Sequence, residues 1–550
     1  MQRALISRPA RITTLLLIVS KGSGRRAPCA PSCLRERSAT RPTWRPRQRL
    51  VLLALAVTSC AALAADPAPV WPTADWTEST PEAQGMAPSA LADLVDFGSR
   101  HAMDSVLVER HGKVVLDAQY APFKPGMKHV VNSVTKAVVS TLVGIAYRRG
   151  KTGPLDSPVL DFFPERGVAN VDPRKETMTL QNLLDSNSGL SWQEPLTDES
   201  PESMLQMERS PDWIGFVLDR PMAQAPGAGF NYNSGAWHLL SAILSRRTGV
   251  DTLFYARKEL FAPLGIADVT WRRDPQGIPI GGYGLLMHPR DMVKIGYLYL
   301  HGGQWDGRQL LPAEWPERVF HPQVDMHLGS LRYANGWWSI PEKRAYMAVG
   351  FLRQLIVVLP DIDTVAVVTG RAHYPFGQLI DRIAEAARSP GPLPADPIGS
   401  ARLADRVAAA GVETRSPVAP APALAAAISG KTFRFPENRI GLQSIKLDLT
   451  AAEPSYETTL AAAAPNGAVR RLQGPIGLDG LFRVREARDM DPVLAVKGSW
   501  VSDNSFQVIA RSLLEGIVVT YVLTFNGSQV DLALEDNSGV RARLRGVAGE

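Results

Sequence analysis

The chain has 550 residues, 45% of them hydrophobic and 21% charged, which is enough apolar sequence for more than one packed core. The net charge of +6 is uneven, because residues 1–64 carry twelve Lys or Arg and one Glu, leaving about −5 for residues 65–550. A basic surface for nucleic acid is therefore not expected in the main body. The cysteines lie only at Cys29, Cys33 and Cys60, which excludes disulfides and thiolate metal sites from the rest.

Residues 45–65 have the pattern of an export signal. Three arginines precede the short apolar run Leu50–Val57, and Ala62–Ala64 provides a small-residue cleavage site. The run is too short to remain as a membrane span, although an uncleaved anchor is an alternative. We predict that residues 1–65 are a leader and signal peptide and that the mature chain is periplasmic. The residues ending at Cys60 also match a lipoprotein box, and a lipid there is the only membrane contact expected.

Strands are predicted before a long helical region. Residues 105–110 and 113–120 alternate between polar and apolar positions and are separated by a His-Gly turn, which is typical of a hairpin. Residues 130–151 are apolar on almost every side after Ser133, which indicates a buried helix that ends near Gly150. Helices and loops rich in Trp and Pro are expected to follow.

Further strands are predicted at the other end of this region. Two apolar runs within residues 346–369 flank Pro360-Asp361 as a hairpin, and residues 376–388 form an amphipathic helix. We expect an antiparallel sheet whose edges come from the two ends of the domain, with helices packed on it. The predicted class is therefore α/β (α+β), a sheet flanked by helices plus a helical subdomain, over residues 66–390.

The composition changes after this domain. Residues 391–427 are dominated by Pro, Ala and Gly, which suggests a linker. Residues 428–550 contain six short alternating runs separated by Asn, Gly and Asp, which indicates a small all-β C-terminal domain: SIKLDLT, FRVREA, FQVIARSLL, IVVTYVLTF, QVDLALE and VRARLRG.

The first chemical motif is Ser133-Val134-Thr135-Lys136 at the start of the predicted buried helix. Residues three apart share one face of a helix, so Lys136 would lie beside the Ser133 hydroxyl. An attacking serine needs a base, and a lysine can serve as one if burial lowers its pKa. The apolar surroundings favour that interpretation, but a capping serine followed by a surface lysine has the same spacing.

A second motif lies about a hundred residues later. Residues 226–235 form a turn-rich segment that contains Tyr232 and leads into an amphipathic helix. A tyrosine beside a lysine ammonium is expected to ionise more easily and so to relay a proton. A half-buried structural tyrosine is the alternative interpretation.

Residues 80–390 resemble the class C β-lactamase and penicillin-binding-protein superfamily of serine hydrolases. The resemblance is closest to its esterase and 6-aminohexanoate-dimer hydrolase branch. It rests on five ordered blocks, each more specific in combination than alone: NSVTK at 132–136, LLDSNSGL at 183–190, FNYNSG at 230–235, GGYGLLMHPRDMVKIGYLYLHGG at 281–303 and YANGWW at 333–338.

The resemblance implies a β-lactamase-like fold and a role for each matching residue. Ser133 would be the nucleophile, Lys136 would activate it, and Tyr232 would pass a proton to the leaving group. Ser234 would be a hydrogen-bond partner in the third position of the tyrosine motif. Gly350 would keep a strand open to substrate, and the backbone N–H groups of Ser133 and Phe351 would form the oxyanion hole.

Two departures from the family pattern concern the substrate. Ala348 stands where the family has a Lys or His that would bind a substrate carboxylate, which weakens the β-lactamase and carboxypeptidase interpretations. Bulky residues follow Gly350, and among them Arg353 is a candidate for the missing charge. Trp192, Trp338 and Arg353 are the candidate substrate-binding residues.

The sequence thus predicts a serine hydrolase that cleaves an amide or ester of a small-molecule or short-peptide-like substrate through an acyl-enzyme on Ser133. No metal and no other cofactor is expected. A β-lactamase or D-alanyl-D-alanine carboxypeptidase is the alternative within the family. A non-catalytic periplasmic binding protein on the same fold is the alternative of another class.

Overall fold

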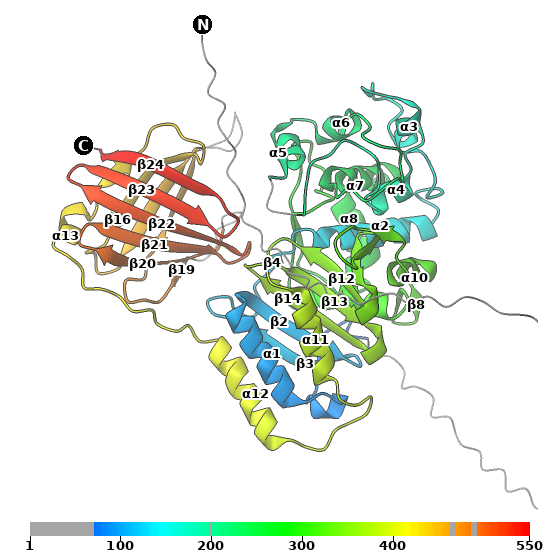
Figure 1. Cartoon of the computed structure of the whole chain (residues 1–550), viewed down its shortest axis with the longest axis horizontal. Coiled ribbons are helices and arrows are strands. Elements are labelled where there is room, and N and C mark those ends of the chain that lie inside the picture. Colours follow the sequence, from blue (N-terminus) through cyan, green and yellow to red (C-terminus); the bar gives the residue numbers. More distant parts are fainter. Residues whose placement is uncertain (1–70, 197–199, 462–468, 486–491, 550) are drawn as a thin grey trace, which may run out of the picture. The chain divides into compact units, whose positions relative to one another are not determined.

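The computed structural model describes residues 71–196, 200–461, 469–485 and 492–549, and two large sheets organise them (Figure 1). The predicted signal peptide, the lipid site at Cys60 and the periplasmic location depend on residues 1–65, which lie outside the described residues, so these stay predictions. Within the described residues, no helix combines the length and apolar composition needed to cross a membrane.

A nine-stranded sheet forms the centre of the first part. Its strands β2, β14, β13, β12, β11 and β10 run antiparallel in this order. The hairpin predicted at residues 105–120 corresponds to β2 and β3, whereas the two runs predicted within residues 346–369 form three strands, β12, β13 and β14. Apolar, mostly β-branched residues fill β13 and β14 because both faces of the sheet are covered. The strands are β1 (Thr77–Glu78), β2 (Met103–Arg110), β3 (Lys113–Gln119), β9 (Val324–Asp325), β10 (Arg332–Ala334), β11 (Trp337–Ile340), β12 (Ala345–Gly350), β13 (Gln354–Leu359) and β14 (Thr364–Gly370).

The predicted position of the chain termini in this sheet is wrong in part. The N-terminal strand β2 pairs with the C-terminal strand β14 in the interior of the sheet, and only the short parallel strand β1 is an edge from a terminus. The other edge is β9, from the middle of the chain. Every residue of the long strands β2 and β14 is buried, which a strand achieves when it has a neighbour on both sides, and this explains their central place.

Helices cover the sheet and build a separate helical subdomain. Helices α11 and α12 pack on α1, α9 packs on β13 and β14, and α2 packs on β12. Short helices and turns fill the region between, where a small sheet orders β4, β6 and β5. The bounds are α1 (Pro88–Arg100), α2 (Val134–Arg148), α3 (Pro173–Glu176), α4 (Leu180–Leu184), α5 (Glu202–Arg209), α6 (Trp213–Leu218), α7 (Ser234–Thr248), α8 (Thr252–Ala256), α9 (Pro289–Leu300), α10 (Glu314–Phe320), α11 (Phe376–Ala386), α12 (Pro397–Ala410), β4 (His129–Val130), β5 (Thr270–Trp271), β6 (Leu285–Met287), β7 (Gln304–Trp305) and β8 (Arg308–Gln309).

The segment 391–427, predicted as a linker, contains helix α12. Asp396 caps this helix by accepting the N–H of Gly399, and Pro397 occupies its first turn. Arg402 of α12 donates to Asp93 of α1 at 2.6 Å. The Ala-rich composition therefore includes a helix that adds a layer to the first domain before the chain continues.

The C-terminal domain is a ten-stranded antiparallel sheet that is barrel-like. Its order is β18-β17-β16-β15-β24-β23-β22-β21-β20-β19, and the two end strands, β18 and β19, are in contact. The six predicted runs correspond to strands, whereas β15, β17, β18 and β20 were not predicted. The bounds are α13 (Leu424–Ile428), β15 (Thr432–Arg434), β16 (Leu442–Asp448), β17 (Ser455–Leu460), β18 (Arg470–Pro475), β19 (Arg483–Arg485), β20 (Leu494–Ser502), β21 (Ser505–Ser512), β22 (Ile517–Asn526), β23 (Gln529–Asp536) and β24 (Arg541–Ala548).

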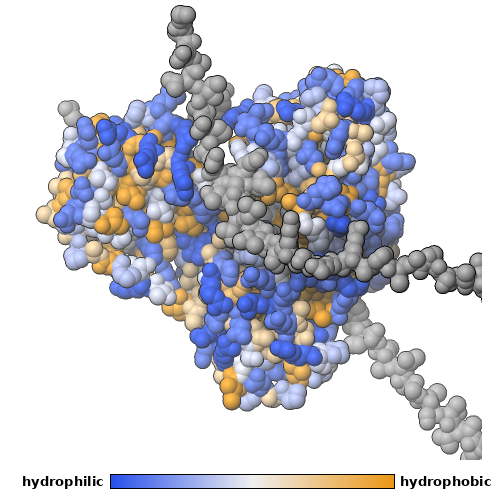
Figure 2. All heavy atoms as spheres, viewed as in Figure 1, coloured by the Kyte–Doolittle hydropathy of each residue, from blue (hydrophilic) through white to orange (hydrophobic). Residues whose placement is uncertain are grey.

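Apolar residues also lie on the outer surface of this domain. On the face shown in Figure 2, hydrophobic residues are interspersed with hydrophilic ones over the β strands. Val501 and Val547 are each about half exposed, at 54% and 51%. The outward positions are therefore less polar than in a simple alternating strand.

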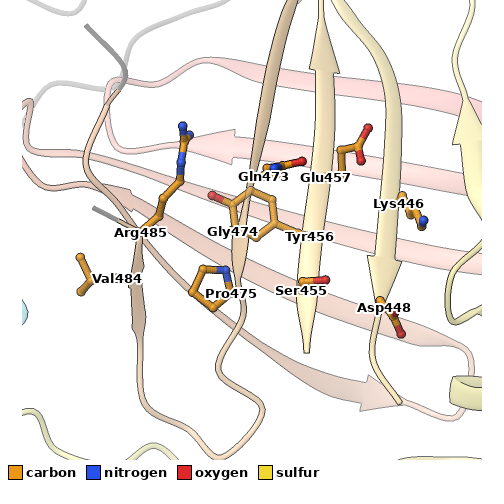
Figure 3. A pocket seen from close by; sticks show the side chains of 10 residues that line it. All are labelled: Lys446, Asp448, Ser455, Tyr456, Glu457, Gln473, Gly474, Pro475, Val484 and Arg485. Atoms are coloured by element: carbon orange, nitrogen blue, oxygen red, sulfur yellow. The ribbon is translucent and has the colours of Figure 1, made fainter. Parts of the chain in front are cut away.

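A polar cavity lies between strands β16 to β19 of the C-terminal domain (Figure 3). Tyr456 and Arg485 border it, together with the cross-strand neighbours Lys446 and Glu457. Its lining includes no residue from the segments that carry Ser133, Lys136 or Tyr232. The cavity is therefore separate from the predicted serine site.

A buried charge cluster connects strand β21 with the first domain. Arg511 donates to Asp104 at 2.8 Å, and Arg371 and His129 lie 3.5 and 3.3 Å from the same carboxyl group. Burial raises the pKa of Asp104, but the hydrogen bond with His129 and the two arginine charges outweigh it and hold that pKa below its ordinary value. Beside this cluster, the N–H of Val130 in β4 donates to the Leu514 carbonyl at 2.6 Å.

We predict that Arg511→Ala lowers the free energy of unfolding by about 3–5 kcal/mol, because it leaves a buried carboxylate with one fewer partner. Urea denaturation at neutral pH measures this. The matched control is Arg545→Ala, whose ion pair with Asp531 in the same domain is exposed and is expected to contribute less than about 1 kcal/mol. Equal losses for the two variants would contradict the prediction.

Candidate active site

Ser133 lies at the N-terminal end of helix α2, directly after a turn. Asn132 has a φ of 49°, in the left-handed region that Asn tolerates better than most residues, and Ser133 takes the N-cap position. The hydroxyl does not cap the helix, since the Ser133 side chain accepts no hydrogen bond from a backbone N–H of the first turn. The turn thus presents a half-buried serine whose oxygen is free for other partners.

Lys136 is one turn further along α2 and is only 1% exposed. Its ammonium donates to three oxygen atoms: Ser133 Oγ at 3.1 Å, Ser234 Oγ at 3.0 Å and the Gly282 carbonyl at 2.8 Å. Burial lowers the pKa of Lys136 to about 8, while the negative charge of Glu194 opposes this shift. A substantial fraction of the amine is therefore neutral near physiological pH, as a base for Ser133 requires.

Tyr232 completes the predicted set, but its pKa is shifted in the direction opposite to the one expected. The Lys136 nitrogen lies over the face of the Tyr232 ring, 4.5 Å from the ring centroid. Burial raises the pKa of Tyr232 well above its ordinary value, and a hydrogen bond with Ser133 opposes the rise only in part. The expectation that Lys136 makes the phenol easier to ionise is therefore wrong: desolvation dominates, and Tyr232 remains a proton donor.

The end of strand β12 lies against the Ser133 turn. A Cβ on Gly350 would lie only 2.5 Å from the Val131 carbonyl, so no side chain fits there. Asn132 Nδ2 donates to the Phe351 carbonyl at 3.1 Å, which fixes Phe351 beside the same turn. In the part of the chain that the structure describes, neither the Ser133 nor the Phe351 N–H donates in a turn or loop hydrogen bond.

Glu194 is a residue of this site that the sequence did not single out. It is nearly buried and accepts three hydrogen bonds: from Ser234 Oγ at 2.5 Å, from the Ser234 N–H at 2.7 Å and from Trp192 Nε1 at 2.7 Å. The residue lies in a loop without a recognisable motif. The only sequence signal was its position two residues after Trp192 in the polar stretch that precedes the Tyr232 segment.

The three candidate substrate-binding residues have different surroundings. Trp338 is edge-on to Tyr232, with ring centroids 6.5 Å apart, and so lies beside the predicted site. Trp192 is 6% exposed and holds Glu194, which is a structural contact. Arg353 donates from Nε to the Tyr374 carbonyl at 2.8 Å, and its guanidinium lies over the ring of Phe376.

Ala348 is completely buried in the middle of β12. No cation therefore stands at the position where the family motif has a Lys or His. In the described ranges, no group of three or more His, Cys, Asp or Glu side chains is arranged to hold a metal ion. The reactive groups described at this site are the Ser133 hydroxyl, the buried Lys136 amine, the Tyr232 phenol and the Glu194 carboxylate.

A comparison with known families agrees with this geometry. The model of the β-lactamase family matches residues 89–388, which is more than half of the chain. The chain belongs to the β-lactamase family. The match includes the Ser133 turn, the Tyr232 segment and strand β12, so this β-lactamase-related serine hydrolase carries all the segments of the site within its family domain.

Individual relatives include hydrolases and acyltransferases. The 6-aminohexanoate-dimer hydrolase of Paenarthrobacter ureafaciens is 25% identical over 298 residues, covering 50% of this chain and 74% of that enzyme. The monacolin J acid methylbutanoyltransferase of Aspergillus terreus is 32% identical over 118 residues, covering 21% of this chain and 28% of that protein. A solved Bacillus anthracis structure assigned to the 6-aminohexanoate-dimer hydrolases has 18% identity and a TM-score of 0.49, covering 57% of this chain and 86% of that one.

We predict that kcat/KM for an ester substrate rises with pH and levels off above an apparent pKa near 8. If the neutral Lys136 amine is the base for Ser133, as the sequence predicts, activity should follow the neutral fraction, which grows as pH increases through that pKa. Initial rates between pH 5 and 10 measure the profile. A flat profile across pH 7–9 in a properly folded enzyme would contradict the assignment.

We also predict that Gly350→Ala lowers kcat by on the order of 10²-fold, because the added carbon pushes strand β12 away from the Ser133 turn and shifts one oxyanion donor. The control is Gly167→Ala, at an exposed position where an added Cβ meets nothing within 4 Å. The control should keep wild-type kcat. If both variants behave alike, Gly350 has no special role at the site.

Proposed function

We propose that this β-lactamase-related enzyme hydrolyses an uncharged ester or linear amide through an acyl-enzyme on Ser133. The observation that carries the proposal is the meeting of Ser133 and Lys136 at 3.1 Å, with the amine buried and its pKa lowered to about 8. A nucleophile and a base held in hydrogen-bonding contact are the minimal requirement for acyl transfer.

In the first half-reaction, Ser133 is the nucleophile, Lys136 is its base and Tyr232 is the proton donor to the leaving group. Lys136 takes the hydroxyl proton as Ser133 Oγ forms a bond to the carbonyl carbon, and the N–H groups of Ser133 and Phe351 stabilise the oxyanion. Collapse breaks the bond to the leaving amine or alcohol, which takes the proton of the Tyr232 phenol. The proton held by Lys136 then restores Tyr232.

The second half-reaction returns the free enzyme. Water attacks the acyl carbon and gives up a proton to the base. The bond between Ser133 Oγ and the acyl carbon then breaks, the base returns that proton to Ser133 Oγ, and a carboxylic acid is released. The relatives named as acyltransferases suggest that an alcohol can take the place of water in this step. The same acyl-enzyme serves both outcomes.

The preference for uncharged substrates rests on the surroundings of strand β12. Ala348 supplies no cation, and Arg353 is engaged by Tyr374 and Phe376. The nearest aromatic groups, Tyr232 and Trp338, offer apolar contact instead. A substrate carboxylate, which β-lactams and D-alanyl peptides carry, would therefore find no cation at the strand position where the family motif has a Lys or His.

The sequence is compatible with two other functions. A β-lactamase or D-alanyl-D-alanine carboxypeptidase uses the same nucleophile, so only substrate discriminates it. A non-catalytic binding protein would have no need for a desolvated lysine within hydrogen-bonding distance of a serine, and burying that amine is energetically costly. The geometry therefore favours the hydrolase.

We predict that Ser133→Ala reduces turnover of p-nitrophenyl acetate by on the order of 10⁴-fold or more, and that Tyr232→Phe reduces it by roughly 10²–10⁴-fold. A fluorophosphonate probe should label the wild-type enzyme and not Ser133→Ala. Esters and linear amides without a carboxylate should be turned over, whereas a fluorescent penicillin should give no stable labelling.

The matched control is Ser455→Ala, which removes a serine that lines the separate cavity of the C-terminal domain. It should retain both turnover and labelling. Unchanged activity in Ser133→Ala would show that the nucleophile is wrongly assigned. Stable penicillin labelling on Ser133 would instead support the penicillin-binding alternative.

A further inference from the structure

The Glu194 carboxylate sets the direction of the Ser234 hydroxyl hydrogen, and Ser234 in turn contacts the Lys136 amine. Its carboxylate oxygen Oε1 can only accept, so the short 2.5 Å contact commits the Ser234 hydroxyl hydrogen to Glu194. The lone pairs of Ser234 Oγ are then left to face Lys136 at 3.0 Å. Ser234 is therefore an acceptor, and not a donor, toward the amine.

This constraint fixes the direction of the amine lone pair. A neutral lysine amine has two N–H donors and one lone pair. The Gly282 carbonyl accepts one N–H, at 2.8 Å, and the constrained Ser234 Oγ accepts the other. The third contact of the nitrogen is Ser133 Oγ at 3.1 Å, so the lone pair points at the hydroxyl whose proton it must take.

We propose that Glu194 is a positioning residue for the reaction, which holds Ser234 as an acceptor and thereby aims the Lys136 lone pair at Ser133. This inference rests on the proposed function, because it assigns how the base is oriented. Glu194 touches neither the nucleophile nor the substrate carbonyl, and it acts through Ser234. It also adds a negative charge that opposes the effect of burial on the Lys136 amine.

A purely structural role for Glu194 makes different predictions. The carboxylate also accepts the N–H of Ser234, the first residue of α7, and the indole N–H of Trp192. Such contacts would stabilise the helix end and the loop, as a helix cap does. Their loss would lower the melting temperature without moving the pH profile of the remaining activity.

The test is a double-mutant cycle with Glu194→Gln and Ser234→Ala, read as kcat and as the pH profile of kcat/KM. A glutamine amide has one accepting oxygen, so it cannot serve both the two N–H donors and the Ser234 hydroxyl. When its NH₂ group faces Ser234, the serine hydrogen turns toward Lys136 and competes for the lone pair. We expect roughly a 10- to 10²-fold loss of kcat in each single variant, part of the factor that a positioned base contributes.

The double variant should be no less active than the less active of the two single variants, because both changes disrupt the same Glu194–Ser234–Lys136 hydrogen-bond arrangement. Glu194→Gln should also move the acid limb to lower pH, since a negative charge near the amine is gone, whereas Ser234→Ala retains that charge and should not produce this shift. The control Glu202→Gln, whose carboxylate accepts from the exposed Gln206 amide on α5, should leave both readouts unchanged.

Losses that multiply in the double variant would overturn the proposal, and so would a Glu194→Gln enzyme with wild-type kcat and an unmoved acid limb. Melting temperatures show whether each variant is folded. The proposed function and the positioning role of Glu194 can be disproved independently. Activity that persists in Ser133→Ala removes the proposed function itself, whereas an inactive Ser133→Ala enzyme with multiplicative losses at Glu194 and Ser234 removes only the positioning role.

Discussion

The burial of a single amine, that of Lys136, is the constraint on which the site depends. An ammonium in a helix surrounded by Val134, Val138 and Val139 loses its hydration, and the protein compensates with three oxygen partners instead of a full counter-charge in contact. With a pKa of about 8, the amine is still mostly charged at neutral pH, but its neutral form is far more accessible than in an ordinary lysine. A lysine held in this state can exchange a proton with a hydroxyl at little cost, which a solvent-exposed lysine cannot do.

The surrounding backbone allows this arrangement because glycines stand at the points of closest approach. A Cβ on Gly282 would lie 2.9 Å from Ser234, and one on Gly336 would lie 3.1 Å from the Lys136 carbonyl. Together with Gly350 these positions let three separate segments reach the first turn of α2. The C-terminal domain contributes at the same place, since its Leu514 carbonyl binds strand β4 just before the nucleophile turn.

Much of this could be predicted from sequence, because the informative signals are local. The i, i+3 spacing places Lys136 beside Ser133, and the apolar helix around them indicates that the lysine amine is desolvated. Long apolar runs predicted the central strands. Glu194 could not be predicted, since its role depends on a contact with Ser234 forty residues later. The protonation of Tyr232 was misjudged because sequence shows the neighbouring cation but not the depth of burial. Strands such as β18 were missed because the sequence RRLQGP does not alternate between apolar and polar residues. In a closed sheet, pairing with neighbouring strands can hold such a segment without that alternation.

The most direct test of the account is the titration of Lys136 itself. Carbon-13 NMR of enzyme labelled at the lysine ε-carbons, with the Lys136 signal assigned by its loss in Lys136→Met, reports the pKa of this amine independently of catalysis. We predict an apparent pKa near 8 for Lys136, well below that of the surface lysines. A value close to the ordinary 10.5 would contradict it, because the amine would then be an ammonium at working pH and Ser133 would lack its base.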